Sequence, residues 1–218
     1  MGLTINYTIT TPTSKQAVEG LEKLRQACLD LPFEEVGKVE RKDITQADLD
    51  YWNELQWGSM FPNNSRENLQ KRNELIEARG FTIWELIKAD NEPTEIVSLV
   101  LYPGEGCEEC AITFRKVDGH YEAQEFCKTQ YAAHFVRCHT LVVAMLDIAK
   151  SIGFEVDVRD EGQFYETRDL CVLAQNLGEY NSLVESIGGQ LRAAGWENDQ
   201  IVCALDKSKN IMVARNSQ

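Results

Sequence analysis

The chain has no long apolar segment and no excess of basic residues, and these two absences exclude several kinds of partner. None of its apolar runs approaches the ~20 residues of a membrane-spanning helix. The residues after Met1 lack the basic start and apolar core of a secretory signal. Its 22 Lys and Arg are outnumbered by 35 Asp and Glu, which gives a formal net charge of −13. Because nucleic-acid phosphates and anionic lipids attract clustered basic residues, we expect an acidic, soluble, cytoplasmic protein that binds neither nucleic acid nor membranes.

Internal repeats and low-complexity linkers are also missing, so nothing in the sequence indicates a division into several domains. A chain of 218 residues is long enough to bury a sizeable hydrophobic core, and its hydrophobic content of 43% is ordinary for a globular protein. We therefore expect a single domain over residues 1–218. Residues 196–218 contain two short apolar runs around Asp206-Lys-Ser-Lys-Asn210 and are a candidate C-terminal hairpin appended to it.

Runs of β-branched and aromatic residues predict a central antiparallel meander over about residues 81–127. The runs at 81–88 and 95–102 flank the turn sequence Asp90-Asn-Glu-Pro93. Asp118-Gly119 then separates two further runs, and an Asp-Gly pair favours a two-residue hairpin turn. Outside the meander, strands are expected at residues 3–9, 34–44 and 153–159.

The spacing of apolar residues predicts three main packed helices. The first begins at Thr13, which can form a capping box with Gln16. The second spans about residues 132–152, and the third begins near Leu170. The buried stripe of the second helix is expected to contain Phe135, Cys138, Val142, Met145, Ala149 and Ile152. A mostly antiparallel sheet with three helices packed on it is an α+β fold.

The turn at Asp118-Gly119 also predicts which residues face each other across the hairpin. A two-residue turn fixes the register, and this register places Cys110 opposite Cys127. Opposed residues share one face of a sheet, with Cβ atoms about 5 Å apart. Cys107 lies three residues before Cys110 and therefore at the same end of the hairpin. We expect these three thiols to converge.

Converging thiols have the chemistry of a zinc site. Zinc prefers four thiolate and imidazole ligands, and a Cys-x-x-Cys turn lets two sulfurs reach one ion. On a helical wheel, His134 and Cys138 lie one turn apart on the buried side, whereas His139 falls at the boundary with the polar side. The candidate zinc ligands are therefore Cys107, Cys110, Cys127 and His134, with Cys138 as the alternative fourth ligand.

Two other interpretations of these cysteines stay open. A second Cys-x-x-Cys pair is missing and a chain of this length needs no metal to fold, so the thiols can be reduced structural residues. A thiol within reach of an imidazole can instead be catalytic or redox-active, although no local signature of a known thiol-hydrolase class is present. For an enzyme, the candidate catalytic residues are Cys127, Arg137, His139 and Glu161.

Four short motifs carry a resemblance to other proteins. They are Pro103-Gly-Glu-Gly-Cys107, Phe126-Cys-Lys-Thr-Gln-Tyr131, Arg137-Cys-His139 and Asp160-Glu-Gly162. Together they resemble a family of uncharacterised bacterial proteins over much of residues 1–190. The resemblance implies a cytoplasmic bacterial protein whose best-defined part is the centre of the chain. It implies no activity.

The sequence leads to two hypotheses of different classes. The first is a non-enzymatic binding or interaction protein, with or without a structural zinc ion. Its partner would be another protein, a small molecule or a second copy of the chain. The alternative is a small-molecule enzyme that uses a thiol or carboxylates in a pocket near Cys127, Arg137 and Glu161. A bound metal ion or ligand would distinguish the two.

Overall fold

The computed structural model describes residues 3–50 and 92–179, and strands from both ranges join one seven-stranded sheet. The strands are β1 (Thr4–Thr11), β2 (Glu35–Val36), β3 (Glu40–Ile44), β4 (Thr94–Tyr102), β5 (Cys110–Val117), β6 (His120–Lys128) and β7 (Glu155–Asp160). Their order is β2-β4-β5-β6-β1-β7, and β3 also pairs with β4. All pairs are antiparallel. The predicted α+β fold with a mostly antiparallel sheet is confirmed.

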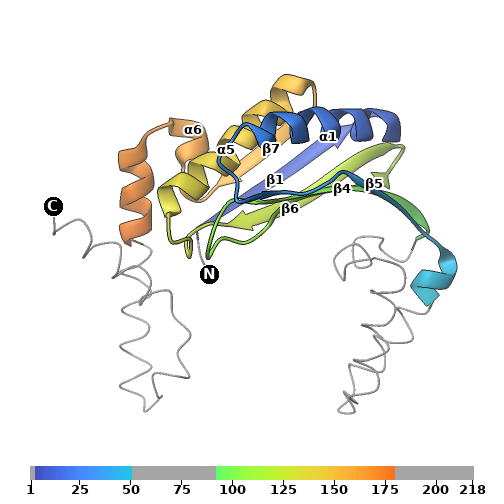
Figure 1. Ribbon diagram of the computed structural model, residues 1–218, viewed down its shortest axis with the longest axis horizontal. Helices are drawn as coiled ribbons and strands as arrows, with labels where there is room; N and C mark the ends of the chain where they lie inside the picture. The colour runs from blue at the N-terminus through green and yellow to red at the C-terminus, as the bar shows by residue number, and fades with distance from the viewer. Residues whose placement is uncertain (1–2, 51–91, 180–218) are drawn as a thin grey trace, which may run out of the picture.

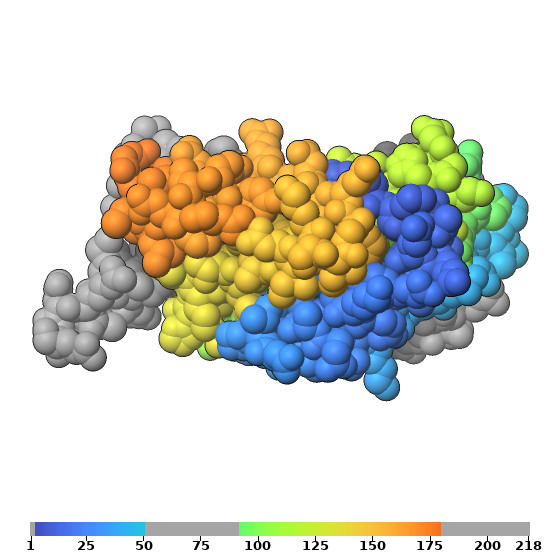
Figure 2. Space-filling model, turned by 90° about the horizontal axis from the view of Figure 1, so that it is seen from above, coloured from blue at the N-terminus to red at the C-terminus, as the bar shows by residue number. Residues whose placement is uncertain are grey.

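Two long helices, α1 (Ser14–Leu29) and α5 (Phe135–Ile152), lie on the same face of the sheet (Figure 1). Seen from the helical side, they lie next to each other along the molecule (Figure 2). The short helix α6 (Phe164–Thr167) follows β7, and a further helix covers residues 170–179. The main core fills the space between α1, α5 and the sheet. No helix within residues 3–50 and 92–179 is long and apolar enough to span a bilayer.

The strand β1 shows how the sequence separates the two faces of the sheet. Its residues alternate between partly exposed and buried along the whole strand, as a period of two requires. Ile5, Tyr7 and Ile9 point into the core under the helices, and the intervening Asn6 and Thr8 point to the opposite face. The predicted half-buried strand is therefore confirmed.

The hairpin between β5 and β6 has the predicted register. Val117 pairs with His120, and the next two pairs continue the same register. The turn residues Asp118 and Gly119 have φ values of 47° and 88°, as a two-residue turn of this type needs. Farther along the two strands, Cys110 and Cys127 are both fully buried on the helical side.

The first helix also agrees with the sequence analysis. Thr13 is its N-cap, and the Thr13 hydroxyl accepts a hydrogen bond from the backbone N–H of Gln16. The Gln16 side chain accepts from the Thr13 hydroxyl and not from the backbone amide that a capping box uses. Cys28 is fully buried in the core near the end of this helix, and burial raises the pKa of its thiol to about 12.

Several predicted boundaries need correction. The strand expected over residues 34–44 is two strands, because its pairing with β4 shifts by one residue between Val36, which lies opposite Leu101, and Glu40, which lies opposite Ser98. α5 begins at Phe135 and not near residue 132, because the preceding residues form turns. Three predicted elements lie outside the described residues: the strand at 81–88, the later part of the third helix and the hairpin at 196–218.

The buried stripe of α5 is largely as expected. Phe135, Cys138, Val142, Met145 and Ala149 are buried, and Ile152 is partly buried against the core. The expectation that His139 lies at the polar boundary is wrong, because its side chain is fully buried. Phe164 of α6 packs edge-on against the His139 ring and covers this side of α5, which a helical wheel cannot show.

The substitution Met145→Asp tests this packing. Met145 is fully buried, so an Asp side chain there would be an unpaired charge in the core, and we expect the free energy of unfolding to fall by several kcal/mol. Urea denaturation followed by circular dichroism measures the change. Val136→Asp is the matched control, because Val136 is exposed in the first turn of α5, where an acidic residue is favourable. Equal losses in the two variants would contradict the observed face of α5.

Candidate functional site

α1 and α5 lie on one face of the sheet (Figure 1). The opposite face carries short and polar side chains at its centre. On β4 and β5, Ser98 lies opposite Thr113 and Val100 lies opposite Ala111. Across β6, β1 and β7, the facing residues are Gln124, Thr8 and Asp157 in one row and Phe126, Asn6 and Arg159 in the next. Short side chains in the middle and longer ones around them leave a depression on this face.

We call this depression the sheet hollow. Its volume is about 770 Å³. The lining residues are Asn6, Tyr7, Thr8, Ser98, Val100, Glu108, Glu109, Ala111, Thr113, Gln124, Glu125, Phe126, Asp157 and Arg159. They come from β1, β4, β5, β6 and β7 and from the loop before β5, so most of them are held in place by the hydrogen-bonded sheet.

The sheet hollow is acidic and contains one exposed aromatic ring. Among the described residues that line it, four are acidic and one, Arg159, is basic. One of the four, Glu108, lies 3.4 Å from the ammonium group of Lys128. Phe126 is 45% exposed and offers a large apolar contact area in the hollow. A cation with an apolar part would find both charge and contact area here.

Tyr7 joins the sheet hollow to the core. Its side chain points to the helical side, yet it also lines the hollow. The Tyr7 hydroxyl donates a hydrogen bond of 2.6 Å to the carbonyl of Ala111 and lies 3.4 Å from the Cys110 sulfur. Burial raises the pKa of Tyr7 well above its usual value, and the neighbouring Cys110 and Cys127 raise it further. Tyr7 is therefore a neutral hydrogen-bond donor.

Behind Tyr7, four thiols form a group that we call the thiol cluster: Cys107, Cys110, Cys127 and Cys138. The sulfurs of Cys107 and Cys127 are 3.8 Å apart. Cys127 also interacts with the thiol of Cys110, and Cys107 with that of Cys138. The predicted convergence of Cys107, Cys110 and Cys127 is confirmed, and Cys138 from α5 joins them.

The thiols of the cluster differ in acidity because they hydrogen-bond to one another. The hydrogen bond from Cys127, followed by that from Cys138, lowers the pKa of Cys107. The same interactions raise the pKa of Cys127 and of Cys138, because each is a donor to a sulfur that carries the negative charge. Of these three thiols, Cys107 is therefore the one expected to carry the negative charge.

The predicted zinc site is only partly assembled by these residues. His134, the expected fourth ligand, is exposed at the N-cap of α5 and makes no side-chain capping bond. Across residues 3–50 and 92–179, no group of three or more His, Cys, Asp and Glu side chains is arranged to hold a metal ion. Cys138, the alternative fourth ligand, does lie beside Cys107. The prediction that His134 points with Cys138 is wrong, because α5 begins only at the residue after His134 and leaves this side chain outside the core.

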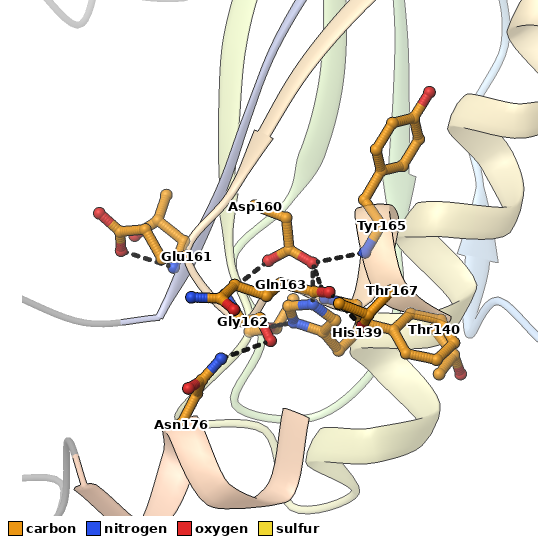
Figure 3. Close-up of polar contacts among 12 residues, drawn as sticks. His139, Thr140, Asp160, Glu161, Gly162, Gln163, Tyr165, Thr167 and Asn176 are labelled. Carbon is orange, nitrogen blue, oxygen red and sulfur yellow. Dashed lines mark hydrogen bonds and ion pairs between the residues drawn. The ribbon is translucent and has the colours of Figure 1, made fainter. Parts of the chain in front are cut away.

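A second buried centre lies where α5 meets the end of β7 (Figure 3). The Nε2 of His139 is 3.0 Å from Oδ2 of Asp160, and both side chains are fully buried. Since a carboxylate can only accept, Nε2 carries the hydrogen. The other ring nitrogen, Nδ1, is hydrogen-bonded to the hydroxyl of Thr129 at 2.8 Å. These three side chains connect β7, α5 and the turn after β6.

Asp160 also fixes the backbone that follows it. Its two carboxylate oxygens accept hydrogen bonds from the backbone N–H groups of Gly162, Phe164 and Tyr165 (Figure 3). Burial alone would raise the pKa of Asp160, but the hydrogen bond and charge of His139, together with these N–H groups, lower it. The carboxylate therefore stays ionised and holds the turn from β7 into α6.

The order hydroxyl, imidazole, carboxylate is also that of a nucleophilic triad. In this protein the hydroxyl of Thr129 is fully buried and does not line the sheet hollow. A substrate would therefore not reach it in this conformation. We interpret Thr129, His139 and Asp160 as a structural group.

The remaining catalytic candidates do not gather in the sheet hollow. The guanidinium of Arg137 donates to the carbonyl of Pro103 and lies 3.8 Å from Glu34. Glu161 accepts a hydrogen bond from the backbone N–H of Thr4. Cys127 belongs to the thiol cluster, and none of the candidates Cys127, Arg137, His139 and Glu161 lines the hollow. Each of them has a local structural partner instead.

The sequence assigns no role to Tyr7 or to Thr129, and the sheet hollow was not predicted. Asp160 and Gly162 had a usable signal, because an Asp at the end of a strand, followed by Gly, is typical of a side chain that bonds the following turn. Tyr7 and Thr129 had none. Their partners are distant in sequence, and only the strand order brings them together.

No protein-family model matches the chain, and neither a curated protein nor a solved structure matches it. Function is therefore inferred from the geometry of the residues described above.

The buried pair of Asp160 and His139 makes a prediction for the pH dependence of stability. The pKa of Asp160 is lower in the folded chain than in the unfolded chain. Its contribution to stability is thus fully present above about pH 4 and is lost as the pH falls through the lowered folded value. Asp160→Asn should reduce the free energy of unfolding by about 3 kcal/mol at pH 7, since a buried pair loses one charge. Urea denaturation at several pH values should show this difference shrinking in acid.

Asp147→Asn is the control for that experiment. Asp147 makes a two-point ion pair with Arg168, but both side chains are almost half exposed. Solvent screens such a pair, so we expect a loss of at most ~1 kcal/mol. If Asp147→Asn and Asp160→Asn reduced the free energy of unfolding equally, the buried pair of His139 and Asp160 would not stabilise the fold more than an exposed ion pair does.

Gly162 allows a test of the same centre by volume alone. A Cβ atom at Gly162 would lie 2.6 Å from Leu173 Cδ1 and 2.9 Å from Cε1 of the His139 ring. The ring is held by hydrogen bonds at both nitrogens, so we expect Gly162→Ala to destabilise the protein by about 1–3 kcal/mol. Thermal denaturation measures the loss. Gly178→Ala is the control, because no described residue lies within 4 Å of a Cβ atom at Gly178 and alanine favours a helix. If Gly178→Ala lowered the melting temperature as much as Gly162→Ala, the steric explanation would be ruled out.

Proposed function

We propose that this protein binds a small, positively charged organic molecule in the sheet hollow. The observation that supports this most is the hollow itself, whose volume of about 770 Å³ is in the range of small-molecule sites. Its walls come from five adjacent strands, so the lining is largely formed before a ligand arrives. A preformed site avoids the entropic cost of ordering side chains on binding.

The charge of the ligand follows from the lining. Glu109, Glu125 and Asp157 are negative and Arg159 is positive, and Glu108 shares its charge with Lys128. An anionic ligand would face repulsion from most of the wall. The net charge of −13 over the whole chain adds a long-range attraction for cations.

The character of the ligand follows from Phe126 and from the polar centre of the hollow. The exposed ring of Phe126 can contact an apolar ring or an ammonium group. Thr8, Thr113 and Gln124 supply hydroxyl and amide groups that can fix the orientation of a polar ligand. We therefore expect an amine with an aromatic or other flat apolar part.

The enzymatic alternative has less support. The candidates Cys127, Arg137, His139 and Glu161 lie outside the hollow lining, and His139 serves the buried centre with Asp160. We therefore favour the binding protein. We also propose a cytoplasmic location, since the described cysteines are free thiols, which persist in a reducing compartment.

Three ring compounds of nearly equal size test the proposal through their charge. Benzylamine is cationic, benzyl alcohol is neutral and benzoate is anionic at neutral pH. In NMR titrations of the isotope-labelled full chain, benzylamine should shift the backbone amide signals of Thr8, Thr113 and Phe126 with a dissociation constant of about 1 mM, as a fragment of this size allows. Benzoate should cause no saturable shift of these signals.

Two substitutions locate the binding. Asp157→Asn removes a carboxylate from the hollow and should weaken benzylamine binding several-fold. Asp118→Asn is its control, because it removes a carboxylate from an exposed turn whose positive φ is also favourable for Asn. Ala111→Trp should fill the hollow and abolish binding. Benzylamine shifts that survive Ala111→Trp, or equal binding of benzoate, would contradict the proposal.

A further inference from the structure

The thiol cluster contains a pair of cysteines that are placed to react with each other. Cys107 is 7% exposed and is the most accessible thiol of the cluster, whereas Cys110, Cys127 and Cys138 are at most 1% exposed. Its sulfur lies 3.8 Å from that of Cys127. We infer that Cys107 and Cys127 are a peroxide-reactive dithiol: Cys107 is oxidised first, and Cys127 then closes a disulfide with it. This inference goes beyond the proposed binding function and does not depend on it.

The reaction balances with a hydroperoxide as the oxidant. The Cys107 thiolate attacks the terminal peroxide oxygen, the O–O bond breaks, and the leaving alkoxide or hydroxide takes up a proton as an alcohol or water. Cys107 then carries a sulfenic acid. The Cys127 sulfur attacks the Cys107 sulfur, the S–O bond breaks, and the hydroxide leaves as water with the proton of Cys127. Two thiols are oxidised to one disulfide, and one peroxide is reduced.

The surroundings assign the two roles in this order. Cys107 is the more exposed of the pair and lies in the loop before β5, so a peroxide reaches its sulfur first and Cys107 is the nucleophile. The hydrogen bond between the two sulfurs also lowers the pKa of Cys107 and raises that of Cys127, which keeps its proton until the sulfenic acid has formed. The other two members of the cluster have different contacts, since Cys138 donates to the carbonyl of Pro103 and Cys110 lies against the Tyr7 hydroxyl.

Closing the disulfide brings the two sulfurs from 3.8 Å to the bonding distance of about 2.05 Å. Cys107 lies in the loop between β4 and β5, whereas Cys127 lies in β6, which is paired with β1. Gly104 and Gly106 precede Cys107, both with positive φ, and let this loop pass close to Tyr131 and Cys138. The N–H of Glu108 bonds to the carbonyl of Lys128 and keeps the loop next to β6.

The test is a map of the disulfide after mild oxidation. The full chain carries Cys171→Ser and Cys203→Ser, because Cys171 is exposed and Cys203 lies outside the described residues. It is treated with a small excess of hydrogen peroxide, remaining thiols are alkylated, and the chain is cleaved after glutamate. Glu108 and Glu109 separate Cys107 from Cys110, and a second cleavage after lysine and arginine separates Cys127 from Cys138 at Lys128 and Arg137, so mass spectrometry identifies each cysteine of the pair.

We expect a linked peptide that joins Cys107 to Cys127, an intact mass lower by two hydrogens, and reversal by dithiothreitol. A linked peptide that joins other cysteines would overturn the inference. So would cysteines that all remain alkylatable, or sulfinic acid on Cys107 without any disulfide. Each of these outcomes is read from the chain with all four cluster thiols intact and does not depend on whether a cluster variant folds.

Three variants then check the order of events, with circular dichroism to confirm that each is folded. In Cys127→Ser the resolving thiol is gone, so the sulfenic acid on Cys107 should accumulate and be trapped by a cyclic 1,3-dione. In Cys110→Ser, the matched control from the same cluster, the disulfide should form as in the parent chain. Trapping on Cys127 in a Cys107→Ser chain at the same rate would reverse the assigned roles and overturn the inference.

Discussion

The alternation of side chains along β1 determines the chemistry of both faces of the sheet. β1 lies between β6 and β7, and each of its residues has a partner on both sides. Ile5, Tyr7 and Ile9 belong to the core beneath the helices, while Asn6 and Thr8 lie in the sheet hollow. A shift of one residue in the pairing of β1 would exchange these two sets. The core and the proposed binding site therefore depend on the same register.

Tyr7 is where the two faces meet. Its ring is part of the core, and its hydroxyl reaches the carbonyl of Ala111 on β5, beyond the intervening β6. The same hydroxyl lies against Cys110 at one end of the thiol cluster. An oxidation event in the cluster and a ligand in the hollow would thus be separated by one side chain. Tyr7 therefore lies between the proposed binding site and the thiol cluster, and neither proposal depends on the other.

The pair of His139 and Asp160 has a different task. It joins α5 to the end of β7, and the Asp160 carboxylate also organises the turn into α6. A carboxylate inside a core is costly unless its hydrogen bonds are satisfied, and here the Asp160 carboxylate accepts from one ring and three backbone N–H groups. The position of α6 is therefore fixed by polar contacts as well as by apolar packing.

Much of the fold could be predicted from local signals, whereas most of the site could not. The period of two predicted the strand β1, and the Asp118-Gly119 pair predicted the hairpin turn. Both patterns depend only on neighbours in sequence, and both predictions are confirmed. The convergence of Cys107, Cys110 and Cys127 followed from that turn. Burial of His139 could not be predicted, because it depends on Phe164 and Asp160 packing against α5 from beyond β7. The sheet hollow could not be predicted either, because it requires the order of five strands, which no local pattern specifies.

Binding of a small cation in the sheet hollow can be seen directly in a crystal structure of the full chain soaked with benzylammonium. We expect density for the ligand in the hollow, with its ring against Phe126 and its ammonium group within hydrogen-bond distance of Asp157, Glu109 or Glu125. A well-ordered hollow without the ligand at a saturating concentration, or density for the ligand at another site alone, would contradict the claim.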